Sequence, residues 1–125
     1  MENKANLQKL SVVYVEDDEI TRDGVGRFLR RRVGWLGLAN DGLQGLELVM
    51  SKKPNIVITD IQMPKMDGIE MIYHIRKEYS KDELPILVVS AFNDIEHYTD
   101  QANDYLNKPI SIDKLYEAIE KLTKL

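Results

Sequence analysis

The chain contains no cysteine, a single tryptophan and only two phenylalanines among its 125 residues. The absence of cysteine excludes disulfide bonds and thiolate metal sites, and it fits a reducing cytosol, so we expect a cytoplasmic protein. No apolar run approaches the roughly 20 residues that a membrane-spanning helix needs, so we expect no membrane insertion. There is no linker, internal repeat or low-complexity tract, and the length suits one domain with one core.

Positive charge is also in short supply. Seventeen lysines and arginines against 21 acidic residues give a net charge of −4. This balance disfavours nonspecific nucleic-acid binding, so we expect no direct nucleic-acid partner. The densest basic stretch, residues 27–32, is interpreted as the solvated end of a helix, where the helix dipole favours cations. Residues 1–8 lack a signal-peptide core and predict a polar lead-in, which leaves 9–125 as the folded domain.

Apolar runs of strand length alternate along the chain with stretches of helical period. Strands are predicted in residues 10–15, 35–39, 55–59 and 86–89 and around Tyr105, and helices in 18–32, 42–53, 66–78, 93–101 and 112–122. Asp18 and Ser111 are predicted N-caps. The resulting (βα)5 pattern predicts an α/β fold, a doubly wound five-stranded parallel sheet in the order 2-1-3-4-5.

Reactive side chains follow the predicted strands where they end. Glu16 and Asp17 follow the first strand, Asp60 the third, Ser90 ends the fourth and Lys108 follows the fifth. In the predicted order the first and third strands are neighbours, about 4.8 Å apart. Their three carboxylates would crowd one another, which raises carboxyl pKa values unless a cation intervenes.

All-oxygen ligands at an exposed edge favour a hard cation, so we expect Mg²⁺ rather than zinc. Lys108 would lie about 10 Å from Asp60 at the backbone, a gap that the two side chains can close. An acidic edge with one ammonium and one hydroxyl therefore predicts a site for a divalent cation and a phosphoryl group. A flavin binder would suit the fold alone, but the acidic edge would repel the flavin phosphate.

Four stretches of the sequence resemble the receiver domains of bacterial two-component response regulators. They lie at residues 12–18, 58–68, 89–91 and 104–109, in the order that the family shows. The second contains Asp-x-x-Met-Pro-x-Met-Asp-Gly at residues 60–68, a highly specific motif. The resemblance covers nearly the whole chain and implies a phosphoacceptor signalling switch, with Asp60 receiving a phosphoryl group from a sensor histidine kinase or a histidine phosphotransfer protein.

The same resemblance implies the remaining roles at the site. Mg²⁺ would be bound by Asp17, Asp60 and the backbone carbonyl of Gln62, with Glu16 acting through water. Ser90 and Lys108 would contact the phosphoryl group. Tyr105 occupies the aromatic switch position, whose ring turns inward when the hydroxyl of the preceding strand moves. The Lys108–Pro109 peptide bond is expected to be cis.

The resemblance also implies a downstream effector protein or domain, and it leaves a homodimer open. One departure affects this output: between Ser90 and Lys108 the chain has about four residues, roughly one helical turn, fewer than the family usually carries. The fourth helix is therefore predicted to be shortened or irregular. A receiver-fold interaction module with altered output remains an alternative.

An Mg²⁺-dependent aspartyl phosphatase is a further alternative. Such an enzyme would want a second aspartate two residues after the nucleophile, where this chain has Gln62. We therefore expect no enzyme, beyond catalysis of the domain's own phosphorylation and dephosphorylation.

Overall fold

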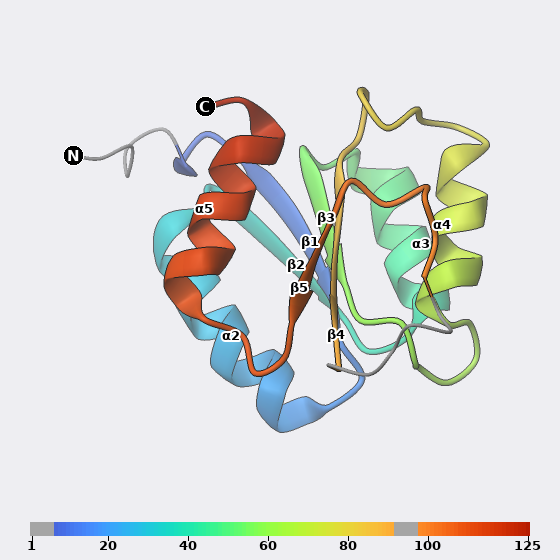
Figure 1. The fold of residues 1–125 in the computed structure, drawn as a ribbon, viewed down its shortest axis with the longest axis horizontal. Helices are drawn as coiled ribbons and strands as arrows, with labels where there is room; N and C mark the ends of the chain where they lie inside the picture. Colours follow the sequence, from blue (N-terminus) through green and yellow to red (C-terminus); the bar gives the residue numbers. More distant parts are fainter. Residues whose placement is uncertain (1–6, 92–97) are drawn as a thin grey trace.

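Strands and helices alternate along most of the chain in the computed structural model, which describes residues 7–91 and 98–125 (Figure 1). The strands are β1 (Ser11–Val15), β2 (Trp35–Ala39), β3 (Ile56–Thr59), β4 (Ile86–Ser90) and β5 (Asp104–Asn107). The helices in the described ranges are α2 (Glu19–Arg32), α3 (Gly42–Lys52), α4 (Gly68–Arg76) and α5 (Ile112–Thr123).

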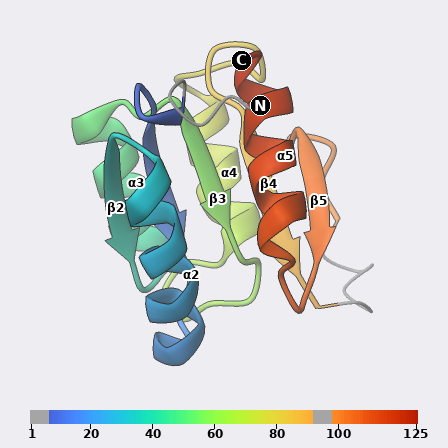
Figure 2. The same cartoon turned by 90° about the vertical axis from the view of Figure 1, so that its left-hand side faces the viewer.

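The five strands form one parallel sheet in the order β2-β1-β3-β4-β5, which confirms the predicted topology. All strands run in the same direction, towards the lower edge of Figure 2. In the register of the sheet, Val15 pairs with Thr59 and Thr59 with Val88, while Ser90 pairs with Asn107. The carboxyl ends of β1, β3, β4 and β5 therefore meet at one edge.

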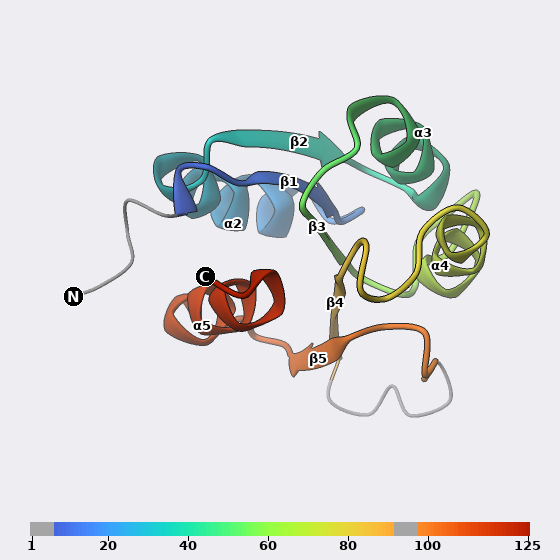
Figure 3. The ribbon, with the colours of Figure 1, turned by 90° about the horizontal axis from the view of Figure 1, so that it is seen from above.

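Helices cover both faces of the sheet. Helices α2 and α5 lie on one face, and α3 and α4 lie on the other (Figures 1 and 3). Each face of the sheet has its own hydrophobic core, and alternate residues of β1 point into one core or the other. Tyr14 packs with Leu29 and Leu115 in the first core, and Val13 packs with Met71 in the second. Every residue of β3 and β4 is buried, which explains their nearly unbroken apolar sequence.

The helices begin at polar caps that the sequence encodes. The side chains of Asp18, Asp41, Asp67 and Ser111 each accept a hydrogen bond from the backbone N–H three residues later. The caps predicted at Asp18 and Ser111 are confirmed. Because Asp67 takes the capping position, α4 begins at Gly68 and not at residue 66 as predicted.

The helix predicted between β4 and β5 falls only partly within the described residues. Of the helix predicted over 93–101, residues 93–97 lie outside the described residues, and residues 98–101 form turns and irregular chain. At the other end of the chain, Leu7 falls within the predicted polar lead-in, yet its side chain is fully buried in the first core. Within the described ranges, no helix has the length and apolarity to span a membrane.

Candidate functional site

Glu16 and Asp17 occupy the turn from β1 into α2. The Glu16 backbone N–H continues the sheet by donating to the Ala39 carbonyl at 3.0 Å, and its own carbonyl accepts from Arg22 Nη1 at 2.9 Å. Glu16 is only 1% exposed, whereas Asp17 is exposed. The turn therefore presents one buried and one solvent-facing carboxylate.

Asp60 follows β3 beside this turn. Its backbone N–H donates to the Val15 carbonyl at 3.1 Å, and its Oδ1 accepts from the Ile61 N–H at 2.7 Å. Gly68 closes the loop behind it: a Cβ atom at this position would lie 2.3 Å from the Asp60 carbonyl oxygen. The absence of a side chain at residue 68 therefore allows the helix to start directly against the Asp60 backbone.

Lys108 reaches both carboxylates from the end of β5. Its Nζ lies 2.9 Å from Glu16 Oε1 and 2.9 Å from Asp60 Oδ2. Its backbone N–H donates to the Ser90 carbonyl at 2.8 Å, which ties the turn after β5 to the end of β4. The Lys108–Pro109 bond is cis, as predicted. The structure thus brings together three of the groups that the sequence placed at this edge.

Burial and the neighbouring charges shift the pKa values of Glu16 and Lys108 in opposite directions. Burial raises the pKa of Glu16 above its usual value, and the hydrogen bond from Lys108 only partly offsets this. For Lys108 burial alone would lower the pKa, but the hydrogen bonds to Asp60 and Glu16 outweigh it and the pKa is raised. The ammonium is therefore held charged, and it stabilises the crowded carboxylates.

The carboxylates of Glu16, Asp17 and Asp60 can offer a joint set of metal ligands. One oxygen from each lies within 4.8 Å of the oxygens of the other two. The set contains only hard oxygen donors, and one member faces solvent, so it suits a hydrated divalent cation such as Mg²⁺. The predicted cluster is present, and its composition fits the expected ion.

Ser90 and Tyr105 lie on neighbouring strands beside the cluster. Ser90 is buried at the end of β4, two residues after Val88, which pairs with Thr59 in the sheet. Tyr105 is half-buried, and its hydroxyl contacts the backbone of Thr99. Gln62 lies exposed in the loop after Asp60.

Two residues that hold the site in place, Arg22 and Gly42, could not be recognised as such from the sequence. Arg22 fixes the Glu16 carbonyl from one turn into α2. Gly42 donates its N–H to the Met66 carbonyl at 2.9 Å, and a Cβ at residue 42 would lie 2.1 Å from that oxygen. The start of α3 thereby holds the loop that follows Asp60. Close backbone approaches of this kind depend on tertiary contacts, so the local pattern does not reveal them.

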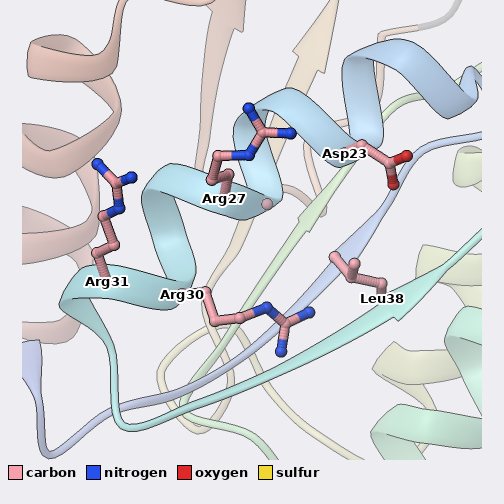
Figure 4. Close-up of a pocket in the computed structure, with 6 residues that line it drawn as sticks. Asp23, Arg27, Arg30, Arg31 and Leu38 are labelled. Atoms are coloured by element: carbon pink, nitrogen blue, oxygen red, sulfur yellow. The ribbon is translucent and has the colours of Figure 1, made fainter.

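The basic stretch of α2 lies apart from this cluster. Arg27, Arg30 and Arg31 border a hollow of about 410 Å³ with Asp23, over Leu38 of β2. Figure 4 shows that the three guanidinium groups point in different directions and do not converge on one position. This geometry agrees with the solvated helix end that the sequence predicted.

The family of the chain follows from comparison with known proteins. The family model described as the response regulator receiver domain matches residues 12–120, and the chain belongs to this family of two-component signalling domains. It is similar to the response regulator MprA of Mycobacterium leprae (strain TN), with 32% identity over 119 residues, covering 92% of this chain and 51% of that protein. The chain spans about half the length of the curated relatives it matches.

Solved structures show the same fold. The DNA-binding response regulator of the LuxR family from Staphylococcus aureus matches with a TM-score of 0.82 and 27% identity, covering 91% of this chain and 98% of that one. The receiver domain of the Francisella response regulator 1452 matches with a TM-score of 0.79 and 26% identity, covering 93% and 98%. The receiver fold therefore accounts for nearly the whole chain.

Proposed function

We propose that the domain accepts a phosphoryl group on Asp60 from a phosphohistidine of a sensor kinase or phosphotransfer protein. The observation that carries this proposal is the position of Lys108 Nζ, 2.9 Å from Asp60 Oδ2 in the middle of an acidic cluster. An anionic nucleophile meets an anionic donor in this reaction, so fixed positive charge at the nucleophile is the main requirement.

In the proposed transfer, an Asp60 carboxylate oxygen forms a bond to phosphorus while the phosphorus–nitrogen bond of the donor breaks. The imidazole leaves with the bonding electron pair and takes up a proton from water. Lys108 stays charged and follows the new phosphoryl oxygens, and Ser90 offers them its hydroxyl. Mg²⁺, when bound, neutralises part of the phosphoryl charge, and Asp17, Asp60 and the Gln62 carbonyl would hold it, with Glu16 acting through water.

The proposed product changes which contacts are favourable at the edge of the sheet. Lys108 exchanges part of its interaction with Glu16 for the phosphoryl oxygens, and Ser90 is drawn towards them. These differences shift an equilibrium between two arrangements of β4 and β5, which a downstream effector protein or domain would read. On this proposal the domain is a switch that processes its own phosphoryl group and has no other substrate.

The direct test is incubation with a small phosphodonor and Mg²⁺, followed by intact-protein mass spectrometry. The wild type should gain one phosphoryl group, and Asp60→Asn should gain none. Asp82→Asn is the matched control, because Asp82 is an exposed aspartate in the turn before β4. Unchanged labelling of Asp60→Asn would contradict the assignment of Asp60, and absence of labelling in the wild type would contradict the phosphoacceptor function.

A further inference from the structure

The chain enters β5 through residues 99–103, which we call the approach segment. This segment contains no helix and lies beside the end of α4 (Figure 1). Side chains from α4, from the turn before β4 and from β5 bind its backbone. The segment is also held by the Asn103 N–H, which donates to the Ile86 carbonyl at 2.8 Å, and by Ala102, which is buried in the second core. The side-chain contacts, which we call tethers, determine how easily the rest of the segment shifts.

Arg76, the last residue of α4, holds one end of the approach segment. Its Nε donates to the Gln101 carbonyl at 2.9 Å, and its Nη2 donates to Asn103 Oδ1 at 3.0 Å. Its Nη1 donates to three carbonyls of the turn between α4 and β4, those of Tyr79, Ser80 and Leu84. All three guanidinium nitrogens are thus used to join the approach segment to that turn.

Asn103 strengthens the same attachment. Its Oδ1 also accepts from the Ile86 N–H at 2.9 Å, and its Nδ2 donates to the Lys81 carbonyl at 3.0 Å. Lys81 in turn donates from its Nζ to the Asp100 carbonyl at 2.8 Å. The end of the approach segment nearest β5 is therefore fixed to the start of β4 and cannot shift without losing several hydrogen bonds.

The Tyr105 hydroxyl holds the other end. It accepts from the Thr99 N–H at 2.6 Å and donates to the Thr99 carbonyl at 2.7 Å. The Tyr105 ring stacks on the ring of Tyr98, with centroids 5.1 Å apart and planes 20° apart. Tyr105 pairs in the sheet with Val88, two residues before Ser90. The predicted switch ring is therefore bonded to the approach segment in the arrangement seen here.

We propose that Arg76 is a positioning residue of the switch, which opposes activation through Tyr105. The Tyr105 ring cannot turn inward while its hydroxyl holds both backbone groups of Thr99. Arg76 prevents the approach segment from moving with the Tyr105 ring. Rotation of the ring must therefore break the Tyr105–Thr99 hydrogen bonds. Together the two tethers form a latch that favours the unphosphorylated arrangement. This inference rests on the proposed phosphoacceptor function, because phosphorylation supplies the opposing free energy.

The test is the affinity for beryllofluoride with Mg²⁺, measured by calorimetry on the full chain. Beryllofluoride imitates a phosphoryl group on an aspartate and is not consumed. Tyr105→Phe keeps the ring and removes the tether, and Arg76→Lys keeps the charge and removes the planar fork. Each should bind beryllofluoride roughly fivefold more tightly, the effect of about one net hydrogen bond. Because both residues restrain one segment, the double variant should gain less than the product of the two effects.

Tyr116→Phe is the matched control, since it removes a tyrosine hydroxyl that donates to the Phe28 carbonyl at 2.9 Å. Tyr116 packs against the first core, on the face of the sheet opposite the core that Tyr105 joins. Its beryllofluoride affinity should equal that of the wild type. Unchanged or weaker binding by Tyr105→Phe overturns the latch, and that variant decides the matter if Arg76→Lys does not fold. A folded Arg76→Lys with lower stability but unchanged affinity shows a merely structural role. A wild type that binds no beryllofluoride and accepts no phosphate overturns the proposed function itself.

Discussion

Replacing Lys108 by methionine tests the electrostatic basis of the site, because methionine keeps most of the side-chain stem and removes the charge. In the wild type this ammonium lies 2.9 Å from both Glu16 and Asp60. Its loss leaves three carboxylates whose oxygens lie within 4.8 Å of one another. Glu16, with 2% of its side chain exposed, has the least access to water.

The loss of the ion pair and the repulsion among the remaining carboxylates both indicate how far Lys108→Met lowers the free energy of unfolding. Removing one partner of a buried ion pair destabilises a protein by about 3–5 kcal/mol. Two like charges at the separation found here repel by about 3 kcal/mol at the effective dielectric constant of a protein surface. Because the Lys108 side chain is 27% exposed, we expect the lower end of the range, a loss of about 3 kcal/mol in the free energy of unfolding at neutral pH without metal.

The loss should depend on pH with a definite sign. Burial raises the folded-state pKa of Glu16, and Lys108 is among the groups that lower it. Lys108→Met therefore raises this pKa further. A carboxyl with a raised folded-state pKa contributes stability that is present at low pH and is lost as pH rises through that pKa. The deficit of the variant should thus be largest above neutrality and should shrink towards pH 5.

Urea unfolding from pH 5 to 8 in the presence of a chelator measures both quantities. Lys121→Met is the control, since Lys121 is 74% exposed and lies 3.7 Å from Asp104, and exposed pairs contribute at most about 1 kcal/mol. A Lys108→Met variant within about 1 kcal/mol of this control, with no pH dependence, would show that the ammonium does not offset the carboxylate repulsion.

Two further predictions concern the metal site and the close approach of Gly68 to Asp60. Mg²⁺ should raise the melting temperature in calorimetric scans, because it binds the folded state. Asp17→Asn should raise the stability without metal and reduce the effect of Mg²⁺. A melting temperature unaffected by Mg²⁺ would rule out the metal site. Gly68→Ala should destabilise by about 1–3 kcal/mol in urea unfolding, because its Cβ would lie 2.3 Å from the Asp60 carbonyl oxygen. Gly24→Ala is the control, because nothing lies within 4 Å of its added Cβ, and it should stabilise the protein by up to about 1 kcal/mol. Equal changes in the free energy of unfolding for the two variants would disprove the steric argument.

The sheet could be predicted because its strands are encoded locally. The apolar runs that became β3 and β4 are buried on both faces, and Pro54 ends the helix before β3 as expected. Helix boundaries were less certain, since α4 starts where Asp67 caps it and not where its apolar period starts. The sequence predicts Leu7 to be part of the lead-in, because a single leucine among polar residues has no periodic pattern to mark its burial.

The site was predictable in composition but only partly in geometry. Strand order placed Glu16, Asp60 and Lys108 at one edge, and the structure confirms that they meet. The contact of Arg76 with the approach segment could not be foreseen, because an arginine at a helix end usually faces solvent and the Gln101 carbonyl that it binds is distant in sequence. Contacts of this kind depend on where the chain turns after β4, which no local pattern specifies.

The double ion pair of Lys108 has a consequence for the valence of the ions that the site accepts. When all groups are ionised, three carboxylates and one ammonium leave two negative charges in a small volume. One divalent cation neutralises this set, whereas a monovalent cation leaves it half compensated. In the proposed phosphorylated state, a phosphoryl charge of about −1.5 to −2 replaces the single charge of Asp60. That proposed state is therefore again short of positive charge, so the surroundings of the phosphoryl group would favour any hydrogen-bond donor that can move towards it.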